Sequence, residues 1–556
     1  MIPKPLLLAR LTGTQEAMGA QHGRLVADDA ARLFEFYRTM PERSLAGDLA
    51  GPAGVAGRWL VRTLATAWQA RLVKTRPAEL AARTAAFIGA VRDTHPQLAD
   101  SHLALATMDS MQNCVSLVAR AALGPFARPI TARVAAAAIP ACSTAIAWGR
   151  ATHDGELMFA RNFDFPGVGV WDAAPAFVVC APDRGQRYGF FTTRGADTPV
   201  VTVVNQAGLV LAPHTRWHRG VGWSGAMIVD LVHDIARRAE TLADAIAIAR
   251  ERPISSSWGL AIGSARERSA IVVEIAGPAV EIVRAPGETL VCANRYRTPA
   301  LQAGQIAASS AWAQHSERRE RRLRELVEHR TALTAQDLAG FLGDRQDAGL
   351  RRHLGGTLNQ AGNVHCAVVA PLARRAWVGV DQAPCCEGTW AELGWDWDGP
   401  AGAWELGGTE HSGFTATARQ DLVAPHDEAS RHVHEAVSRY EATHDVAAAR
   451  AAIDRAVAAD PDDPSLRLAA LWLALEARAP DRAVVHAHAG LAKETDPYRR
   501  GQLLLWGARA ADPALAKRWL AELAALSGDG LGELQAASRK RFRGRPHINL
   551  MMQDAY

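Results

Sequence analysis

The sequence predicts a mixed α+β fold in which sheets pack between helices, followed by a separate helical region. Short strand-like runs with turn residues between them fill residues 142–408, and two helical segments, 226–251 and 317–341, interrupt those runs. Strand groups separated by helices are typical of layered α+β folds. The 556 residues exceed one ordinary domain, and a hydrophobic content of 48% suffices for a large core.

The N-terminal residues 1–141 are expected to form a helical segment. Apolar residues recur there at helical spacing, and alanine is frequent. The stretches with this spacing are 16–37, 56–72, 79–92 and 100–122. The spacing of apolar residues changes from helical to strand-like at residue 142, which marks the first predicted domain boundary.

The first two strand-like runs after that boundary predict a β-hairpin. They cover residues 143–148 and 157–160, and Asp154-Gly155 between them is expected to form a tight turn. Cys142 begins the first strand, and Arg161 and Asp164 end its partner. Because a hairpin brings its two ends together, these three side chains are expected to lie within reach of each other.

This grouping has a chemical interpretation. A thiol becomes a good nucleophile once it is deprotonated, and a nearby cation such as the Arg161 guanidinium lowers its pKa. The Asp164 carboxylate could then orient an amine. Taken singly, each residue has a plainer interpretation: Cys142 as a buried structural cysteine, Asp164 as a turn residue, and Arg161 as the partner of a surface carboxylate.

The pattern resembles cysteine N-terminal-nucleophile hydrolases, which show a Cys-Ser or Cys-Thr opening, a hairpin and an end like Arg161-Asn162-Phe163-Asp164. The closest resemblance is to the acyl-coenzyme A:6-aminopenicillanic acid acyltransferase family of self-processing cysteine peptidases, over residues from about 10 to 400. Choloylglycine hydrolases are more distantly similar. Three further elements occur in the family's order: Asn205-Gln206-Ala207-Gly208-Leu209, Ala293-Asn294-Arg295-Tyr296 and, near the start, Gly19-Ala20-Gln21-His22-Gly23.

The resemblance implies a four-layer αββα N-terminal-nucleophile hydrolase fold for residues 142–424 and a precursor role for residues 1–141. It also implies a mechanism. Cys142 would cleave the chain after Ala141 and release the precursor segment, and its new α-amine would serve as the base for its own thiol. Asn205 and Asn294 would donate hydrogen bonds to the oxyanion of the acyl-transfer step. Without the resemblance, both asparagines could simply be turn residues.

The substrate implied by this resemblance is a small acyl-amide, an acyl thioester or a peptide-like molecule, attacked through an acyl-enzyme on Cys142. Hydrolysis and acyl transfer both remain open, because they differ only in whether water or an amine takes the acyl group. The alternative is a non-catalytic scaffold, in which a degenerate hydrolase fold carries a partner-binding helical tail.

The C-terminal residues 425–556 predict a helical domain. Helical runs joined by short turns are expected at 428–441, 445–459, 465–477, 480–493, 499–510 and 513–525. Asp460-Pro461 and Asp496-Pro497 close two units at a spacing close to that of tetratricopeptide repeats. An irregular helical bundle fits the pattern equally well. If the repeats are real, these helices could bind a protein partner.

The composition excludes several other classes. A net charge of +4 is small for this length and indicates neither a nucleic-acid nor a membrane partner. The seven cysteines are odd in number and scattered, which favours a reducing compartment, so we expect a cytoplasmic protein. The sequence contains no C-x-x-C pair, Walker loop, H-E-x-x-H motif or G-x-S-x-G elbow. We therefore expect no metal and no cofactor.

Overall fold

The structure of the chain is a computed structural model. It describes residues 3–46, 51–98, 106–107, 109–110, 112–113, 141–222, 224–306, 310–328, 330–407, 413–540, 546 and 548–555. The helix expected over residues 100–122 falls largely outside this part of the chain.

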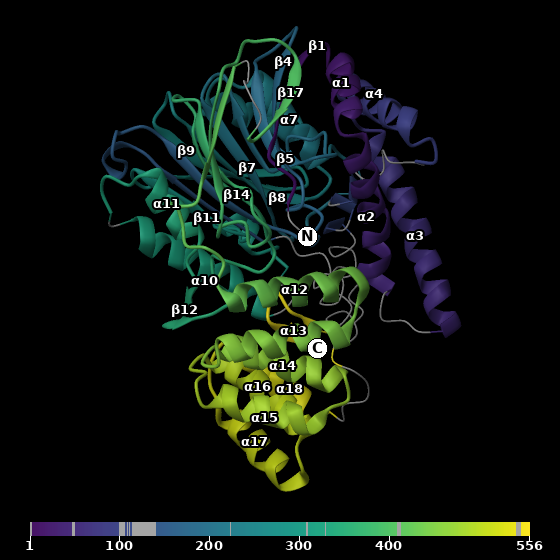
Figure 1. The fold of residues 1–556 in the computed structure, drawn as a ribbon, viewed down its shortest axis with the longest axis vertical. Helices are drawn as coiled ribbons and strands as arrows, with labels where there is room; N and C mark the ends of the chain where they lie inside the picture. Colours follow the sequence, from purple (N-terminus) through teal and green to yellow (C-terminus); the bar gives the residue numbers. More distant parts are fainter. Residues whose placement is uncertain are drawn as a thin grey trace.

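Two β-sheets stacked face to face form the centre of the molecule (Figure 1). Side chains from both sheets meet in one hydrophobic core, for example Ile146 and Phe159 from one sheet with Phe177 and Val210 from the other. Alternation along each strand points every second side chain into this core. The predicted α+β arrangement is confirmed.

The larger sheet has nine strands and the smaller has seven. In spatial order the larger sheet contains β10 (Ala279–Arg284), β9 (Ser269–Ala276), β8 (Ser257–Ser264), β7 (Leu209–Thr215), β6 (Thr202–Asn205), β5 (Tyr188–Thr193), β4 (Pro175–Pro182), β1 (Leu7–Gly13) and β17 (Gly402–Glu405). The smaller sheet contains β11 (Thr289–Cys292), β2 (Ala141–Ala147), β3 (Met158–Asp164), β14 (Asn363–Ala370), β15 (Arg375–Gly379), β16 (Trp390–Trp395) and β18 (Phe414–Arg419).

Helices cover the outer face of each sheet, which completes four layers. α7 (Ile228–Arg238) and α8 (Leu242–Glu251) pack on the larger sheet, and α10 (Ser310–Val327) and α11 (Ala335–Leu342) pack on the smaller one. Each of the two helical segments expected from the sequence is therefore a pair of helices. The second helix of each pair begins at a capping box, formed by Thr241 with Asp244 and by Thr334 with Asp337.

The N-terminal segment is mainly helical, as expected, but it also contributes a strand. Its helices are α1 (Gln15–Leu25), α2 (Ala27–Ala46), α3 (Gly51–Val73) and α4 (Ala78–Thr94). Strand β1 lies between β4, to which it is parallel, and β17, to which it is antiparallel. The apolar residues near the start of the chain thus form part of the larger sheet.

The two glycines of the Gly-x-x-x-Gly element lie where α1 packs against α4. A Cβ atom at Gly19 would come within 2.1 Å of the backbone oxygen of Arg83, and one at Gly23 within 2.4 Å of that of Phe87. Only glycine permits this close approach of two helix backbones.

Strands β2 and β3 form the hairpin expected from the sequence, but its turn is wider. Residues 148–157 connect the strands and include a 3₁₀ helix, Gly149–Ala151. Gly149 and Gly155 adopt positive φ angles of 63° and 77°. The ladder pairs Cys142 with Phe163 and Thr144 with Arg161.

A helical domain lies below the sheets in Figure 1. Its helices are α12 (Glu428–Thr443), α13 (Val446–Ala459), α14 (Pro464–Glu476), α15 (Pro480–Leu491), α16 (Pro497–Ala510), α17 (Pro513–Ala525) and α18 (Leu531–Ser538). Consecutive helices from α12 to α17 pack against each other, and α16 also contacts α14 and α18. The first six helices match the ranges expected from the sequence within about two residues. Among the described helices, none is both long and apolar enough to cross a membrane.

Candidate active site

Cys142 lies at the start of β2 on the face between the two sheets. Its side chain is buried, with the residue 1% exposed, and the Nη2 atom of Arg161 donates to its Sγ at 3.2 Å. Arg161 is fixed by further bonds to the backbone oxygens of Val201 and Pro213. Burial raises the pKa of the Cys142 thiol, and the Arg161 guanidinium opposes this rise. The structure therefore brings together the thiol and the cation that the hairpin predicted.

The backbone of Cys142 is held from the neighbouring strand and from the outer helix layer. Its N–H donates to Oδ1 of Asn294 at 2.9 Å, and its carbonyl oxygen accepts from Nη1 of Arg319 at 2.6 Å. Arg319, which is buried on α10, also donates to Oδ1 of Asn294 at 2.8 Å and to Oγ of Ser143 at 2.9 Å. The nitrogen that would become the α-amine after cleavage thus already faces a hydrogen-bond acceptor.

Asp164 ends β3 on the opposite face from Cys142 and is fully enclosed. Its two carboxylate oxygens accept from Nδ2 of Asn363 at 3.0 Å and from Nε2 of Gln360 at 2.9 Å. Burial raises its pKa to about 7, although Arg319, the bond from Asn363 and Arg161 each act to lower it. No direct contact joins its side chain to the Cys142 thiol within the described residues.

Asn205 does not join this group. Alternation along β6 places Val204 in the core between the sheets and Val203 on the face covered by helices, so Asn205 shares the face of Val203. Its Nδ2 donates to the backbone oxygens of Ala236 and Ala239 at the end of α7, and its Oδ1 accepts from the N–H of Leu209. The family resemblance implies an oxyanion donor at this position. The structure instead gives Asn205 a role in holding helix α7 on the sheet.

Asn294 joins the group, but with a different orientation from the one expected. It presents its oxygen to Cys142, while its Nδ2 donates to the backbone oxygen of Thr215 at 3.0 Å. In this arrangement Asn294 holds the nitrogen of Cys142, and its amide hydrogens are directed elsewhere.

An apolar cavity of about 80 Å³ lies between the N-terminal helices and the larger sheet. Its walls include Leu33 and Tyr37 from α2, Phe87 from α4, and Trp171 and Val200 from the sheet domain. Two residues that line the cavity, Trp171 and Val200, lie close to residues that contact Cys142 or Arg161. Trp171 packs edge-on against Phe163, the strand partner of Cys142, with ring centroids 5.5 Å apart. The residue after Val200 is Val201, which binds Arg161 through its backbone oxygen.

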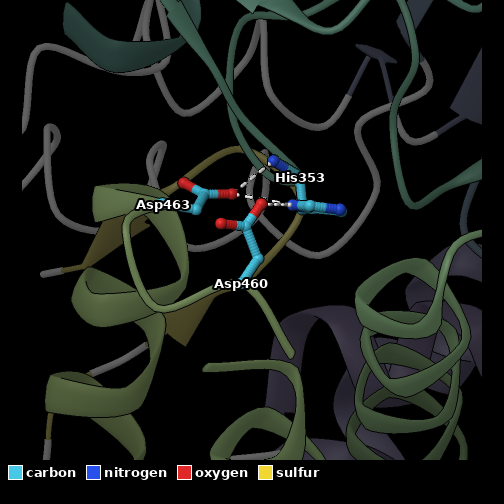
Figure 2. Close-up of side chains that lie close together, drawn as sticks. All are labelled: His353, Asp460 and Asp463. Carbon is cyan, nitrogen blue, oxygen red and sulfur yellow. Dashed lines mark hydrogen bonds and ion pairs between the residues drawn. The ribbon is translucent and has the colours of Figure 1, made fainter. Parts of the chain in front are cut away.

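One cluster within the described residues has the composition of a metal site. His353, Asp460 and Asp463 each offer a ligand atom, and these atoms lie within 4.8 Å of one another (Figure 2). The imidazole is already bound on both sides, by Asp463 at Nδ1 (2.9 Å) and by Asp427 at Nε2 (3.2 Å). Burial alone would lower the pKa of His353, but these two bonds together raise it. Both ring nitrogens thus face carboxylate oxygens already, so the arrangement fits a set of hydrogen-bonded ion pairs.

Sequence analysis missed Arg319, Gln360 and Asn363. A signal for Arg319 was present, because the buried stripe of α10 runs through Trp312, Ser316, Arg319, Leu323 and Leu326. An arginine on the apolar stripe of a helix is unusual and usually has a partner. Gln360 precedes β14 and Asn363 begins it, so no periodic pattern separates them from other polar residues of the connection.

Comparison with known proteins identifies one family. Residues 150–384 match the model of the family described as acyl-coenzyme A:6-aminopenicillanic acid acyl-transferase. No curated protein is similar enough to count as a match. Among solved structures, the chain is similar to a Caenorhabditis elegans N-acylethanolamine-hydrolyzing acid amidase (NAAA) ortholog. That similarity has 14% identity and a TM-score of 0.30, and it covers 41% of this chain and 93% of the other.

The family match confirms the resemblance inferred from the sequence. It contains Arg161, Asp164, Asn294 and Arg319, and it begins eight residues after Cys142. It indicates an enzyme of the acyltransferase or amide hydrolase type.

Proposed function

With the acyltransferase-family match over residues 150–384 as the premise, we propose that the protein is a self-processing cysteine N-terminal-nucleophile hydrolase or acyltransferase. The observation that carries this proposal is the 3.2 Å contact between Arg161 and the Cys142 thiol, at a strand start whose backbone nitrogen faces Asn294. Two other described cysteines, Cys180 and Cys292, also lie beside guanidinium groups, but Cys180 lies inside β4 and Cys292 ends β11, whereas Cys142 lies near the start of its strand.

The first step would be cleavage of the chain itself. The Cys142 sulfur attacks the carbonyl carbon of Ala141, the C–N bond to Cys142 breaks, and the nitrogen takes up a proton to become a free amine. Water then hydrolyses the resulting thioester and restores the thiol. Burial holds the thiol largely protonated in the uncut chain, so Arg161, which favours the thiolate, assists this step.

The second step would be acyl transfer. The α-amine of Cys142, held by Oδ1 of Asn294, accepts the proton of the thiol, because an α-amine and a thiol have ordinary pKa values that differ by only about one unit. The thiolate attacks an acyl carbonyl, the amine or thiol leaving group departs with a proton, and an acyl-enzyme forms on Sγ. Water or an acceptor amine then takes the acyl group. Arg319 donates hydrogen bonds to both Asn294 and the Cys142 carbonyl oxygen, so it holds Asn294 in position beside the α-amine.

The substrate class follows from the cavity. Its walls are mainly aromatic and aliphatic side chains, including Tyr37, Phe87 and Trp171, and Trp171 packs against Phe163, the strand partner of Cys142. Such a wall favours an apolar acyl group over a charged one. We therefore propose an amide or thioester of an apolar acid as substrate.

The decisive test is a denaturing gel of the purified protein together with a thiol-reactive probe. Cleavage at 141/142 should divide the 59.6 kDa chain into pieces of about one quarter and three quarters, because it separates 141 residues from 415. Cys142→Ala should leave one band, whereas Cys366→Ala, a matched change at another buried cysteine, should cleave normally. A single intact band from the wild type that also fails to react with the probe would favour the non-catalytic scaffold.

A further inference from the structure

The connection between α11 and β14, residues 343–362, contacts both the candidate active site and the helical domain. It contains the short strands β12 (Gln346–Asp347) and β13 (Leu350–Arg351) and is otherwise irregular. We call it the bridging segment. Every residue of it is described, and much of it is buried.

The end of the bridging segment holds the active site. Gln360, together with Asn363 just beyond the segment, binds the two oxygens of Asp164. The N–H of Phe165 donates to the backbone oxygen of Gly362 at 2.9 Å. On the same strand, Nδ2 of Asn162 donates to the backbone oxygens of Leu342 and Leu358 at 2.8 and 2.9 Å. The end of β3 is therefore positioned by this segment from both sides of Asp164.

The middle of the bridging segment is fastened to the helical domain by buried charges. Arg352 forms two bonds of 2.7 Å with the carboxylate oxygens of Glu494, and both side chains are at most 1% exposed. His353 binds Asp463 at the start of α14 through both its backbone N–H (2.8 Å) and its ring. Asp347 pairs with Arg499 on α16.

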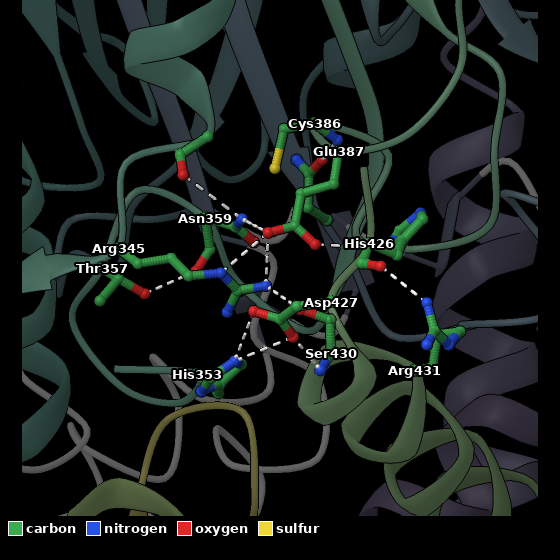
Figure 3. Close-up of polar contacts among 12 residues, drawn as sticks. Arg345, His353, Thr357, Asn359, Cys386, Glu387, His426, Asp427, Ser430 and Arg431 are labelled. Atoms are coloured by element: carbon green, nitrogen blue, oxygen red, sulfur yellow. Dashed lines mark hydrogen bonds and ion pairs between the residues drawn. The ribbon is translucent and has the colours of Figure 1, made fainter. Parts of the chain in front are cut away.

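A second set of contacts, shown in Figure 3, fastens the start of the segment to α12. Arg345 pairs with Glu387 and donates to Oγ of Ser430 on α12. The same Glu387 oxygen accepts from Nδ2 of Asn359 at 2.8 Å, immediately before Gln360. The contacts therefore run without a break from α12 to the residue next to a partner of Asp164.

Helix α10 provides an independent connection of the same kind. Arg319 on this helix binds the Cys142 carbonyl and Asn294, while the adjacent Arg318 pairs with Asp496, the N-cap of α16. One helix thus carries an active-site arginine and, next to it, an anchor to the helical domain.

We propose that the C-terminal helical domain is a positioning element of the active site, which acts through the bridging segment on Asp164 and through α10 on Arg319. This inference rests on the proposed function. It also identifies the partner of these helices, which is the catalytic domain of the same chain, bound mainly through charged residues at or just before the starts of α14 and α16 and through Ser430 of α12.

The physical cost of loosening this contact is high. A buried ion pair that loses one partner leaves an uncompensated charge, so the remaining group must move toward water or toward another ion. Movement of the bridging segment by as little as 1 Å would shift the partners of Asp164, and misplacement of this size in an active site can cost about 100-fold in rate.

The test compares two Glu→Gln variants of the helical domain. Glu494→Gln removes the charge that Arg352 requires, with almost no change of shape. Glu435→Gln is the control, because Glu435 lies on the exposed side of α12, where it pairs with Arg455 and His432. Acylation is followed as the burst of p-nitrophenol from p-nitrophenyl octanoate, across pH 5 to 9, with thermal unfolding as the check of folding.

Glu494→Gln should lower the acylation rate constant by about tenfold or more with little change in KM, since no residue that lines the cavity belongs to the bridging segment. The acid limb of its pH profile should move to higher pH, because weaker bonds from Gln360 and Asn363 favour the protonated Asp164. Glu435→Gln should match the wild type. A merely structural role would lower the yield of folded protein and leave the pH profile of the folded fraction in place.

If Glu494→Gln does not fold, Asp463→Asn replaces it. This variant removes the charge beside His353 and retains an oxygen that can cap α14. A folded variant, of either kind, with the rate and pH profile of the wild type would overturn the inference. A wild-type protein with no burst, or a burst that survives Cys142→Ala, would instead refute the proposed function, so the two failures are distinguishable.

Discussion

Two buried carboxylates, Asp197 at the N-terminal junction and Asp164 in the candidate active site, have very different partners. Asp197 lies where the N-terminal helices meet the larger sheet, and Arg83 on α4 binds both of its oxygens at 2.6 and 2.8 Å. The Nδ1 atom of His22 on α1 is a third partner at 2.8 Å. Although burial would raise the pKa of Asp197, Arg83 and His22 hold it well below its usual range.

Among the described residues, no cation binds Asp164 directly. Two neutral amides bind it, and the guanidinium groups of Arg319 and Arg161 act only from a distance, so its pKa is about 7. The junction therefore contains a permanent ion pair, whereas the candidate active site contains a carboxyl group that can titrate near neutral pH. Titratable buried groups of this kind are common at functional sites.

The comparison predicts first that cleavage will not separate the two pieces. Residues 1–141 supply β1 to the interior of the larger sheet and Arg83 to the buried pair with Asp197, so release would expose both. The family resemblance, by contrast, implies release of this segment. Under native conditions we expect a single species near 59.6 kDa that gives two bands only after denaturation, as measured by native mass spectrometry and gel electrophoresis. A free species with three quarters of that mass would contradict the permanent character of the junction.

The second prediction concerns removal of the buried ion pair at the junction. Arg83→Met leaves Asp197 buried without its main partner, and loss of one member of a buried ion pair costs about 3–5 kcal/mol. Denaturant unfolding of the variant should show this loss. The control is Arg187→Met, since Arg187 pairs with the largely exposed Asp398, and exposed pairs contribute about 1 kcal/mol or less. Similar losses in both variants would mean that the junction depends on something other than this pair.

The third prediction concerns the packing beside that pair. Gly19→Ala places a Cβ 2.1 Å from the Arg83 backbone oxygen and should destabilise the protein by about 1–3 kcal/mol, as overpacking does. Gly89→Ala, on α4 itself, meets no atom of the described residues within 4 Å and should stabilise the helix by up to about 1 kcal/mol. Thermal unfolding of the two variants should therefore shift in opposite directions. Shifts of the same sign would show that the close approach of α1 and α4 is not maintained in solution.

How much of this site the sequence could predict depends on the range of each interaction. The approach of Arg161 to Cys142 follows from a hairpin, which is local, and from the alternation of side chains along two paired strands. The role expected for Asn205 came from the family resemblance, whereas the alternation along β6 places its side chain on the face that the helices cover. Local spacing alone does not determine that register.

The partners of Asp164 depend on contacts between residues far apart in the chain. Gln360 and Asn363 lie 196 and 199 residues from Asp164, and they reach it only because β14 pairs with β3. The bridging segment in turn takes its position from Glu494, which lies 142 residues from Arg352. Strand runs and helices were therefore predictable from periodicity, whereas the order of the strands and the buried ion pairs were not.

The last prediction distinguishes the two carboxylates by how each one makes the stability of the fold depend on pH. The pKa of Asp164 is about 7 in the folded chain, against an ordinary value of 3.8, so the folded state keeps a proton that the unfolded state releases. The stability that this carboxyl contributes is complete below about pH 4 and falls as the pH rises to about 7, by at most about 1.4 kcal/mol per pH unit. Asp164→Asn removes this dependence, so the free energy of unfolding of the wild type should fall relative to that of the variant between pH 4.5 and 7. Asp197 acts in the opposite direction, since its lowered pKa stabilises the fold above about pH 4 and loses this effect as the pH falls further. A constant difference between wild type and Asp164→Asn across that window would mean that Asp164 is ionised throughout, as Asp197 is, and the distinction between the two sites would disappear.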